Sequence, residues 1–296
     1  MADHPSLPRF DLQAHSTFSD GELEPAAVVE AAAAAGVELL ALTDHDTVAG
    51  VGAALAAGAL NGVTVLPAVE ISAIDLDHQP PCELHILGYK IDHDQPWVRE
   101  ELNRYVEDRK LRTLRMAEAL KDLGFALEER LLEERIAAGR SIGRVHVAQA
   151  AIAHPANRKR LEEEGIGEMG DLIRAYLVEG KPAFRIREKP TVAEAVEMIH
   201  KAGGIAVWAH PFWDFKDPAE VTSTIDRFKA VGIDGVEAFY LTHDQDQTAL
   251  IVERCKQHSL LATGSTDFHG PNNSLFNRFL GFQTFGFAPV LGDLVG

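Results

Sequence analysis

The chain has 296 residues, of which 46% are hydrophobic and 25% are charged, as is typical of a globular protein with one large domain or a domain carrying an insertion. Its formal net charge of −17 argues against a surface for long duplex nucleic acid, because such surfaces are basic. The two cysteines, Cys82 and Cys255, are too few for a disulfide framework, so we expect a reducing, cytoplasmic compartment.

Neither a signal peptide nor a membrane span is expected. The polar first residues lack the apolar stretch of a signal peptide. The Ala-rich residues 25–42 are apolar, but Glu30 and Glu38 interrupt them and Gly36 indicates a helix end.

The first third of the chain alternates between strand and helix patterns. A short strand opens the stretch "FDLQAHSTFSDG" at residues 10–21. It is followed by a helix at 24–36, a strand at 37–43, a helix at 47–60, and strands at 62–72 and 83–92. We expect Asp46 or Thr47 to contribute to the cap of the helix at 47–60.

The middle of the chain looks different. Helical patterns cover residues 97–123, 130–139, 144–154 and 170–180, and the next strand-like signal comes only around Ala183. We interpret residues 96–182 as a mostly helical insertion that leans over the rest of the domain as a cap.

The alternation resumes in the last third. Residues 191–204 predict a helix with a capping box from Thr191 to Glu194, and Asp217 with Pro218 begins a helix that ends at residue 232. Strands are predicted at 205–210, 233–240 and 260–266, with a helix at 246–258. About seven strands alternating with helices indicate parallel βαβ units, so residues 8–95 and 183–290 should form one α/β barrel domain.

Polar side chains gather at the ends of these strands. In a closed parallel barrel all of them would converge on one face, where barrel enzymes build their sites. In chain order they are His15 and Asp20; Asp44, His45 and Asp46; Glu70; His85; His210; Glu237, Tyr240 and His243; Asp267 and His269.

A single histidine near a strand end is more often a hydrogen-bonded loop residue, and we weigh the odds at roughly three to one against function for any one alone. The recurrence of such residues at nearly every predicted strand end reverses these odds, because independent capping residues would not favour imidazole so consistently. A cluster of imidazoles and carboxylates suits Mn²⁺, Fe²⁺ or Zn²⁺.

Six motifs in order resemble those of the polymerase and histidinol phosphatase superfamily, the PHP phosphoesterases: "DLQAHSTFSDG", "LALTDHDTVAG", "VEIS", "LHILGY", "GGIAVWAHP" and "GSTDFHG". The insertion and "IGRVHVAQA" are similar to the TrpH-like subfamily of metal-dependent phosphoesterases. The resemblance implies a distorted (β/α)7 barrel that holds two or three divalent ions, with Mn²⁺ expected for activity.

Carried over residue by residue, the resemblance implies a set of metal ligands and a bridging role for Glu70. The family has a histidine where this chain has Gln13, whose neutral amide is a weaker ligand, so one metal position should be weakened. The implied set is Gln13, His15, Asp20, His45, Glu70, His85, His210, Asp267 and His269.

The resemblance also implies a mechanism, in which a metal-bound hydroxide attacks phosphorus in line with the leaving oxygen. Glu70, His210 and Asp267 are the expected catalytic residues, and Asp44 and Asp46 should orient imidazole N–H groups. Expected substrate contacts are Arg144, His146, Tyr240 and His243. Arg109, Arg112 and Arg115 point either toward the cleft or into solvent.

Three functions remain open. The first is a phosphatase acting on a nucleotide, as the resemblance implies for nucleoside 3′,5′-bisphosphates. The second is a 5′-3′ exoribonuclease acting on short RNA. The third is a metal- or nucleotide-binding protein whose activity is reduced by Gln13. The acidic net charge favours the first over the second.

Overall fold

The computed structural model describes residues 9–186 and 190–295. Residue 8 and residues 187–189, which the sequence analysis assigns to the barrel domain, lie outside the described residues.

A seven-stranded sheet forms the centre of the fold, with its strands in sequence order. The first and last strands meet through a parallel bridge between Ala14 and Phe268 and a hydrogen bond from Leu12 N to Gly264 O at 3.2 Å. The predicted distorted (β/α)7 barrel is therefore confirmed. The strands are β1 (Phe10–Asp11), β2 (Leu39–Leu42), β3 (Thr64–Asp75), β4 (Cys82–Tyr89), β5 (Ile205–Trp208), β6 (Gly235–Tyr240) and β7 (Leu261–Ser265).

The expectation that all strands run parallel is wrong for β4, which pairs antiparallel with both β3 and β5. The segment at 76–81 between β3 and β4 is too short for a crossover, so the chain must turn back as a hairpin. The reversal puts the first half of β4 at the carboxyl end of its neighbours. His85 pairs with Ser72 and so reaches the same end of the barrel as Glu70.

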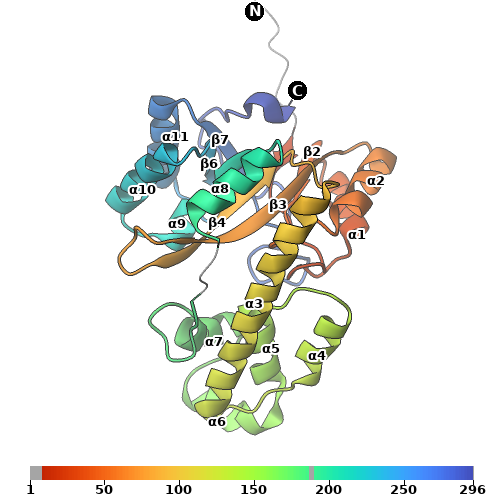
Figure 1. Cartoon of the computed structure of the whole chain (residues 1–296), viewed down its shortest axis with the longest axis vertical. Helices are drawn as coiled ribbons and strands as arrows, with labels where there is room; N and C mark the ends of the chain where they lie inside the picture. The colour runs from red at the N-terminus through yellow and green to blue at the C-terminus, as the bar shows by residue number, and fades with distance from the viewer. Residues whose placement is uncertain (1–8, 187–189, 296) are drawn as a thin grey trace, which may run out of the picture.

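Helices cover the outside of the sheet (Figure 1). The helices α1 and α2 lie on one side of it, α10 and α11 lie on the other, and α8 crosses between them. Their bounds are α1 (Pro25–Ala34), α2 (Val51–Asn61), α8 (Val192–Lys201), α9 (Pro211–Asp214), α10 (Pro218–Ala230) and α11 (Gln245–His258), followed by the 3-10 helix η3 (Gly292–Val295).

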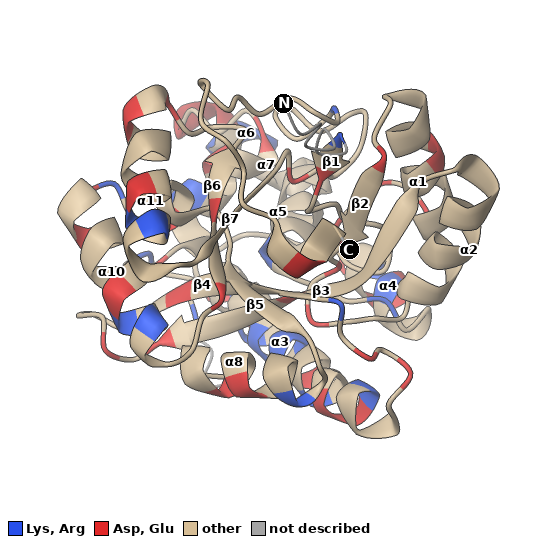
Figure 2. Ribbon diagram, turned by 90° about the horizontal axis from the view of Figure 1, so that it is seen from above, with Lys and Arg blue, Asp and Glu red and all other residues tan. Residues whose placement is uncertain are grey.

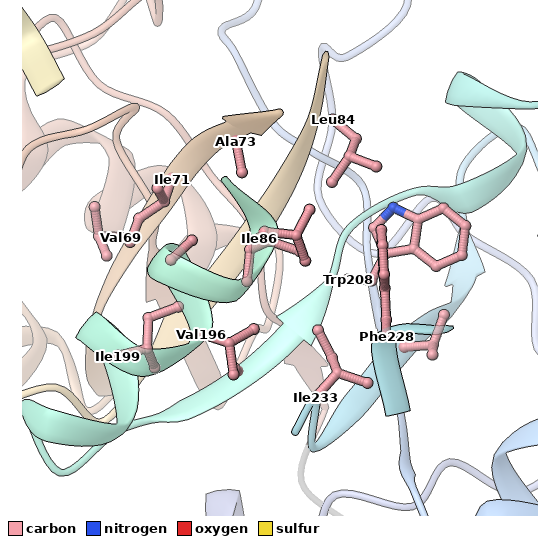
Figure 3. Packing of buried hydrophobic residues seen from close by; sticks show 14 of the residues in the cluster. Val69, Ile71, Ala73, Leu84, Ile86, Val196, Ile199, Trp208, Phe228 and Ile233 are labelled. Atoms are coloured by element: carbon pink, nitrogen blue, oxygen red, sulfur yellow. The ribbon is translucent and has the colours of Figure 1, made fainter. Parts of the chain in front are cut away.

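The main hydrophobic core lies between the sheet and the helices α8, α10 and α11. On the α8 side, Val196 and Ile199 face Ile71 and Ile86 of the strands (Figure 3). The helix presents its apolar side because its hydrophobic residues recur at helical spacing. Trp208 of β5 is fully buried in the same cluster.

A second group of helices comes between β4 and α8 and has a hydrophobic cluster of its own, drawn from residues between Met116 and Ala183. It lies apart from the sheet at the far end of α3 (Figure 1). Its elements are α3 (Pro96–Asp122), α4 (Arg130–Ala137), α5 (Arg144–Ala153), η1 (Pro155–Asn157), α6 (Arg158–Glu163), α7 (Met169–Leu172) and the π-helix η2 (Ile173–Leu177).

The long helix α3 belongs to both cores. Val98, Leu102 and Tyr105 in its first half pack into the barrel core, whereas Met116 and Leu120 pack into the second cluster. The predicted boundary between residues 95 and 96 falls at the start of α3, a helix that packs into both cores. The division into a barrel domain and an insertion stays a prediction.

Local predictions have mixed outcomes. The Thr191–Glu194 capping box and the Asp217 cap are both present. The predicted cap at Asp46 is wrong, because α2 begins later, after Gly50, while the Asp46 carboxylate accepts from Ser72 N. Thr47 Oγ1 accepts from Ala49 N in the turn before α2.

The strand predicted around Ala183 is absent, since residues 183–186 lie outside any strand. Among the described residues, the chain there follows η2 and pairs with no strand. The short helices α6, α9, η1 and η3 were not predicted from the sequence, because they are too short to show a hydrophobic period.

Charged residues of both signs alternate along α3, α10 and α11, while α1 and α2 carry few charges (Figure 2). Within the described residues, no helix combines the length and the apolar character needed to cross a membrane.

Candidate metal centre

The structure brings all the predicted ligand residues to one end of the barrel. They come from the loops that follow β1, β2, β5 and β7, from the middle of β3, where Glu70 lies, and from the first half of β4. Three groups among them have potential ligand atoms within 4.8 Å of one another: His15 with Glu70 and Asp267; His45 with Glu70 and His85; and His15 with Asp20, His45 and His269.

Glu70 is the residue that links these groups. Its Oε2 lies 2.9 Å from His15 Nε2 and 3.8 Å from His45 Nδ1. Its Oε1 lies 2.5 Å from His85 Nδ1 and 3.4 Å from His210 Nε2. One buried carboxylate thus faces four imidazoles, an arrangement in which each oxygen can hold a separate ion.

Asp20 and Asp267 complete the outer groups. Asp20 lies 3.6 Å from a ring nitrogen of His45 and 3.5 Å from His269 Nε2. Asp267 Oδ1 lies 3.1 Å from His15 Nε2. His15 and His269 stack with ring centroids 4.3 Å apart.

The buried polar atoms of this cluster fit a metal ion. The potential ligand atoms His15 Nε2, Asp20 Oδ1, His45 Nδ1 and Asp267 Oδ1 are buried and have no aligned hydrogen-bond partner among the described residues. Such atoms cost free energy unless something satisfies them. Their mixture of imidazole and carboxylate suits a first-row divalent ion.

The backbone at this end of the barrel is strained. Asp46, His210 and Asp267 have positive φ angles of 57°, 32° and 55°. Residues other than glycine adopt such angles at a cost, and they gather at functional sites where side-chain direction matters.

The histidines of the cluster favour the ionised forms of its carboxyl groups. Burial disfavours charge on Glu70, but the imidazoles of His45 and His85 hold the pKa of its carboxyl well below the usual range. Burial likewise disfavours charge on Asp20, and its histidine neighbours, His45 and His269, lower its pKa. Both carboxylates are therefore ionised at neutral pH and available to a cation.

Gln13 lies in the cluster, as predicted from its spacing with His15. Its side chain is fully buried, with Nε2 donating to Glu70 Oε2 at 2.9 Å and Oε1 lying 3.3 Å from Ser265 Oγ. The amide nitrogen thus faces the shared carboxylate. The assignment of Gln13 as a metal ligand stays a prediction.

Asp44 supports His15 through a serine. Its carboxylate accepts from the backbone and hydroxyl of Ser16 and from Ser19 Oγ, and Ser19 Oγ lies 3.3 Å from His15 Nδ1. Asp44 was expected to orient an imidazole N–H directly, but it contacts the His15 imidazole only through the Ser19 hydroxyl. Asp46 instead pairs with Arg109.

The arginines of α3 have different environments. Arg109 is buried and reaches Asp46 and Ser72 Oγ, and Arg112 is buried against Glu83. Of the three arginines, only Arg115 is exposed and points into solvent. These contacts tie the insertion to the metal-binding end of the barrel.

Arg144 and His146 open α5 close to the same end of the barrel. Arg144 is 29% exposed and lies 3.9 Å from Glu83. His146 is mostly buried, and its Nδ1 accepts from Gly143 N at 3.0 Å. Burial lowers the pKa of His146 to about 4, so the ring is neutral at pH 7 and carries its proton on Nε2.

Tyr240 and His243 are buried, and the Tyr240 ring lies against the His210 ring with centroids 5.4 Å apart. The Tyr240 hydroxyl donates to Asp267 Oδ2 at 2.8 Å, and the His243 ring packs against Tyr240 with centroids 5.4 Å apart. Tyr240 therefore orients Asp267. The roles of both residues as substrate contacts stay predictions.

Arg135 of α4 contacts the site but was not predicted from the sequence. Its guanidinium donates to the backbone carbonyls of Thr17, Ser19 and Ser141. It thus holds the loop that carries Asp20 against the insertion. Contacts to carbonyl groups leave no pattern in a single sequence, so nothing there distinguished Arg135 from its neighbours.

Known proteins resemble the chain over nearly its whole length. A family model described as PHP domain matches residues 11–93. A 5′-3′ exoribonuclease from Haemophilus influenzae is 32% identical over 89% of this chain and 90% of its own length. A 3′,5′-nucleoside bisphosphate phosphatase from Chromobacterium violaceum is 32% identical over 90% of this chain and 88% of its own length.

A solved structure superposes on nearly all of the fold. It is an amidohydrolase from Chromobacterium violaceum with bound sulfate and no metal, 30% identical, with a TM-score of 0.81. The superposition covers 97% of this chain and 95% of that one.

Proposed function

The chain belongs to the PHP family of metal-dependent phosphoesterases, and we propose that it hydrolyses a phosphate monoester of a nucleotide, foremost a nucleoside 3′,5′-bisphosphate. The observation that carries the proposal is that three groups of potential metal ligands, two of which share Glu70, lie at the end of the barrel that the insertion contacts through Arg109 and Arg144. A bisphosphate offers one phosphate to each of these regions.

Two or three divalent ions would be held by His15, Asp20, His45, Glu70, His85, His210, Asp267 and His269, with Gln13 beside them. We expect Mn²⁺ to support activity best, with Fe²⁺ or Zn²⁺ as the alternatives. When bound, the ions supply positive charge to the phosphoryl oxygens and lower the pKa of water.

The chain's own residues set the geometry of the reaction. The Glu70 carboxylate belongs to two of the groups of potential ligands, and the hydrogen bond from Gln13 fixes its orientation. The Tyr240 hydroxyl keeps Asp267 turned toward His15. Glu70, His210 and Asp267 are the proposed catalytic residues, because all three face the centre of the cluster.

The second phosphate of the substrate would bind to Arg144 and His146. Arg144 is a permanent cation with a fork of donors that suits phosphate. His146 presents a neutral Nε2–H donor, because its Nδ1 accepts from Gly143. These contacts explain why a bisphosphate would bind better than a simple phosphate ester.

The second candidate is 5′-3′ exoribonuclease activity on short RNA, as in the relative from Haemophilus influenzae. The net charge of −17 favours the small substrate, because extended RNA needs a longer basic track. The third candidate is a binding protein with activity reduced by Gln13. We also infer a cytoplasmic location from the two buried, free cysteines.

A steady-state assay separates these functions. The protein with Mn²⁺ should release inorganic phosphate from adenosine 3′,5′-bisphosphate with a higher kcat/KM than it shows on a 5′-phosphorylated trinucleotide RNA. Glu70→Gln should abolish both reactions. Faster degradation of the RNA would favour the exoribonuclease, and the absence of turnover with Mn²⁺, Fe²⁺ and Zn²⁺ would favour the binding protein.

A further inference from the structure

An exposed tryptophan lies at the edge of the metal centre. Trp213 belongs to α9, which begins directly after His210, and its backbone N–H donates to His210 O at 2.8 Å. The side chain is 48% exposed, whereas Trp208 is fully buried. The position of Trp213 is thus fixed by the loop that carries His210.

The ring of Phe276 supports this tryptophan from a second loop. The Trp213 and Phe276 rings meet edge to face, with centroids 5.6 Å apart and an angle of 61° between the planes. Phe276 also contacts the His269 ring at 5.5 Å and the Tyr240 ring at 6.1 Å.

The backbone holds Phe276 in place. Its carbonyl accepts from His269 N at 2.9 Å, and its N–H donates to Asn273 Oδ1 at 2.9 Å. Both aromatic side chains are therefore anchored to loops that carry candidate metal ligands, and the exposed ring lies two ring contacts from His269.

Exposure of this surface is costly unless something covers it. Trp213 leaves nearly half of a large apolar side chain in water, and the neighbouring Leu275 is 40% exposed. Aromatic and apolar side chains exposed at the rim of a polar site are typical of ligand-binding surfaces. A rigid aromatic ring loses little side-chain entropy when a flat ligand stacks on it.

We propose that Trp213, supported by Phe276, is a stacking platform for the nucleobase of a substrate whose phosphate lies at the metal centre. The proposal rests on the proposed function and adds to it the recognition of the base. His269 and Trp213 both contact the Phe276 ring, at centroid distances of 5.5 Å and 5.6 Å, so a phosphate at the metal centre and a base on Trp213 would lie on either side of the ribose. Stacking tolerates all bases and favours purines, because they have the larger ring.

Paired substrates test the platform. Trp213→Ala should raise the KM for adenosine 3′,5′-bisphosphate roughly 10-fold and change the KM for the base-free anhydroribitol 3,5-bisphosphate less than twofold. Trp213→Phe should retain most of the affinity for the nucleotide. Equal effects of Trp213→Ala on both substrates would overturn the platform and leave the phosphatase proposal intact.

Tryptophan fluorescence provides a readout that needs no turnover. Adenosine 5′-monophosphate should quench the emission of the wild type, and Trp213→Phe should remove that quenching. Trp97→Phe is the matched control, because Trp97 packs under Lys201 on α8, and it should leave the quenching unchanged. If quenching persists in Trp213→Phe, the base binds elsewhere and the proposal fails, whether or not the wild type hydrolyses nucleotides.

Discussion

Gln13 donates a hydrogen bond from Nε2 to Glu70 Oε2 at 2.9 Å, so the residue that departs from the family motif contacts the carboxylate shared by two of the metal groups. The other end of the amide lies 3.3 Å from Ser265 Oγ. Held at both ends, Gln13 presents an N–H group to the cluster where an imidazole would present a lone pair.

Replacement of Gln13 by histidine should strengthen the metal centre. We expect Gln13→His to raise metal occupancy and phosphatase activity at limiting Mn²⁺, because imidazole is the better ligand. The difference should narrow at saturating Mn²⁺, since mass action fills a weak site. Metal analysis and rate measurements across a Mn²⁺ titration check this.

The control for this substitution is Gln257→His, which places a new imidazole at an exposed position of α11. It should leave occupancy and rate as in the wild type. If Gln13→His does the same over the whole titration, Gln13 already serves as a full ligand or plays no part, and the idea of a weakened site is wrong.

Metal removal should lower thermal stability. The chelated protein leaves the buried atoms of His15, His45 and Asp267 without partners, so Tm should fall and recover when Mn²⁺ is added. At 100 times the dissociation constant, one bound ion stabilises by about 2.7 kcal/mol. Calcium should restore less, because it prefers oxygen ligands. A Tm that changes neither with chelator nor with added Mn²⁺ would argue against a structural metal.

Loss of the Arg135 guanidinium should loosen the loop that carries Asp20. Arg135→Met keeps the apolar stem and removes the donors to the Thr17 and Ser19 carbonyls. Supporting contacts of this kind affect metal affinity roughly 10- to 100-fold, and the Mn²⁺ dissociation constant should rise within that range. Isothermal titration measures it.

Arg130→Met on the same helix is the matched control for Arg135, because Arg130 is 68% exposed and pairs only with glutamates of the insertion among the contacts described. Its Mn²⁺ affinity should equal that of the wild type. An equal loss of affinity in both variants would indicate general damage to α4 rather than a specific contact to the loop.

His146 should make the protein less stable in acid. Burial lowers its pKa to about 4 in the folded state, below the unfolded value of 6.5, so the stabilisation present above pH 6.5 is lost as the pH falls through 4. Between pH 7 and pH 5, the wild type should lose about 2 kcal/mol more than His146→Asn. Urea denaturation at the two pH values compares them. An identical pH dependence would mean that the pKa of the ring is the same in the folded and unfolded protein.

Much of the fold was predictable because it depends on local patterns. The strands and helices of the barrel follow from hydrophobic period, and the Thr191 and Asp217 caps follow from side chains that act on their own backbone. The set of strand-end residues was predictable for a similar reason. Side chains that follow parallel strands must emerge at one end of a barrel, whatever the details of its packing.

Only the tertiary structure decided which of these side chains touch, and how the insertion meets them. The hairpin of β3 and β4 brings His85 to Glu70, and the pairing of β4 with β5, more than a hundred residues further along the chain, brings His210 to both of them. The contacts of Arg135 with loop carbonyls and of Trp213 with Phe276 depend on elements that are distant in sequence. A sequence pattern records the period of one element, but a contact between two elements depends on the packing of both.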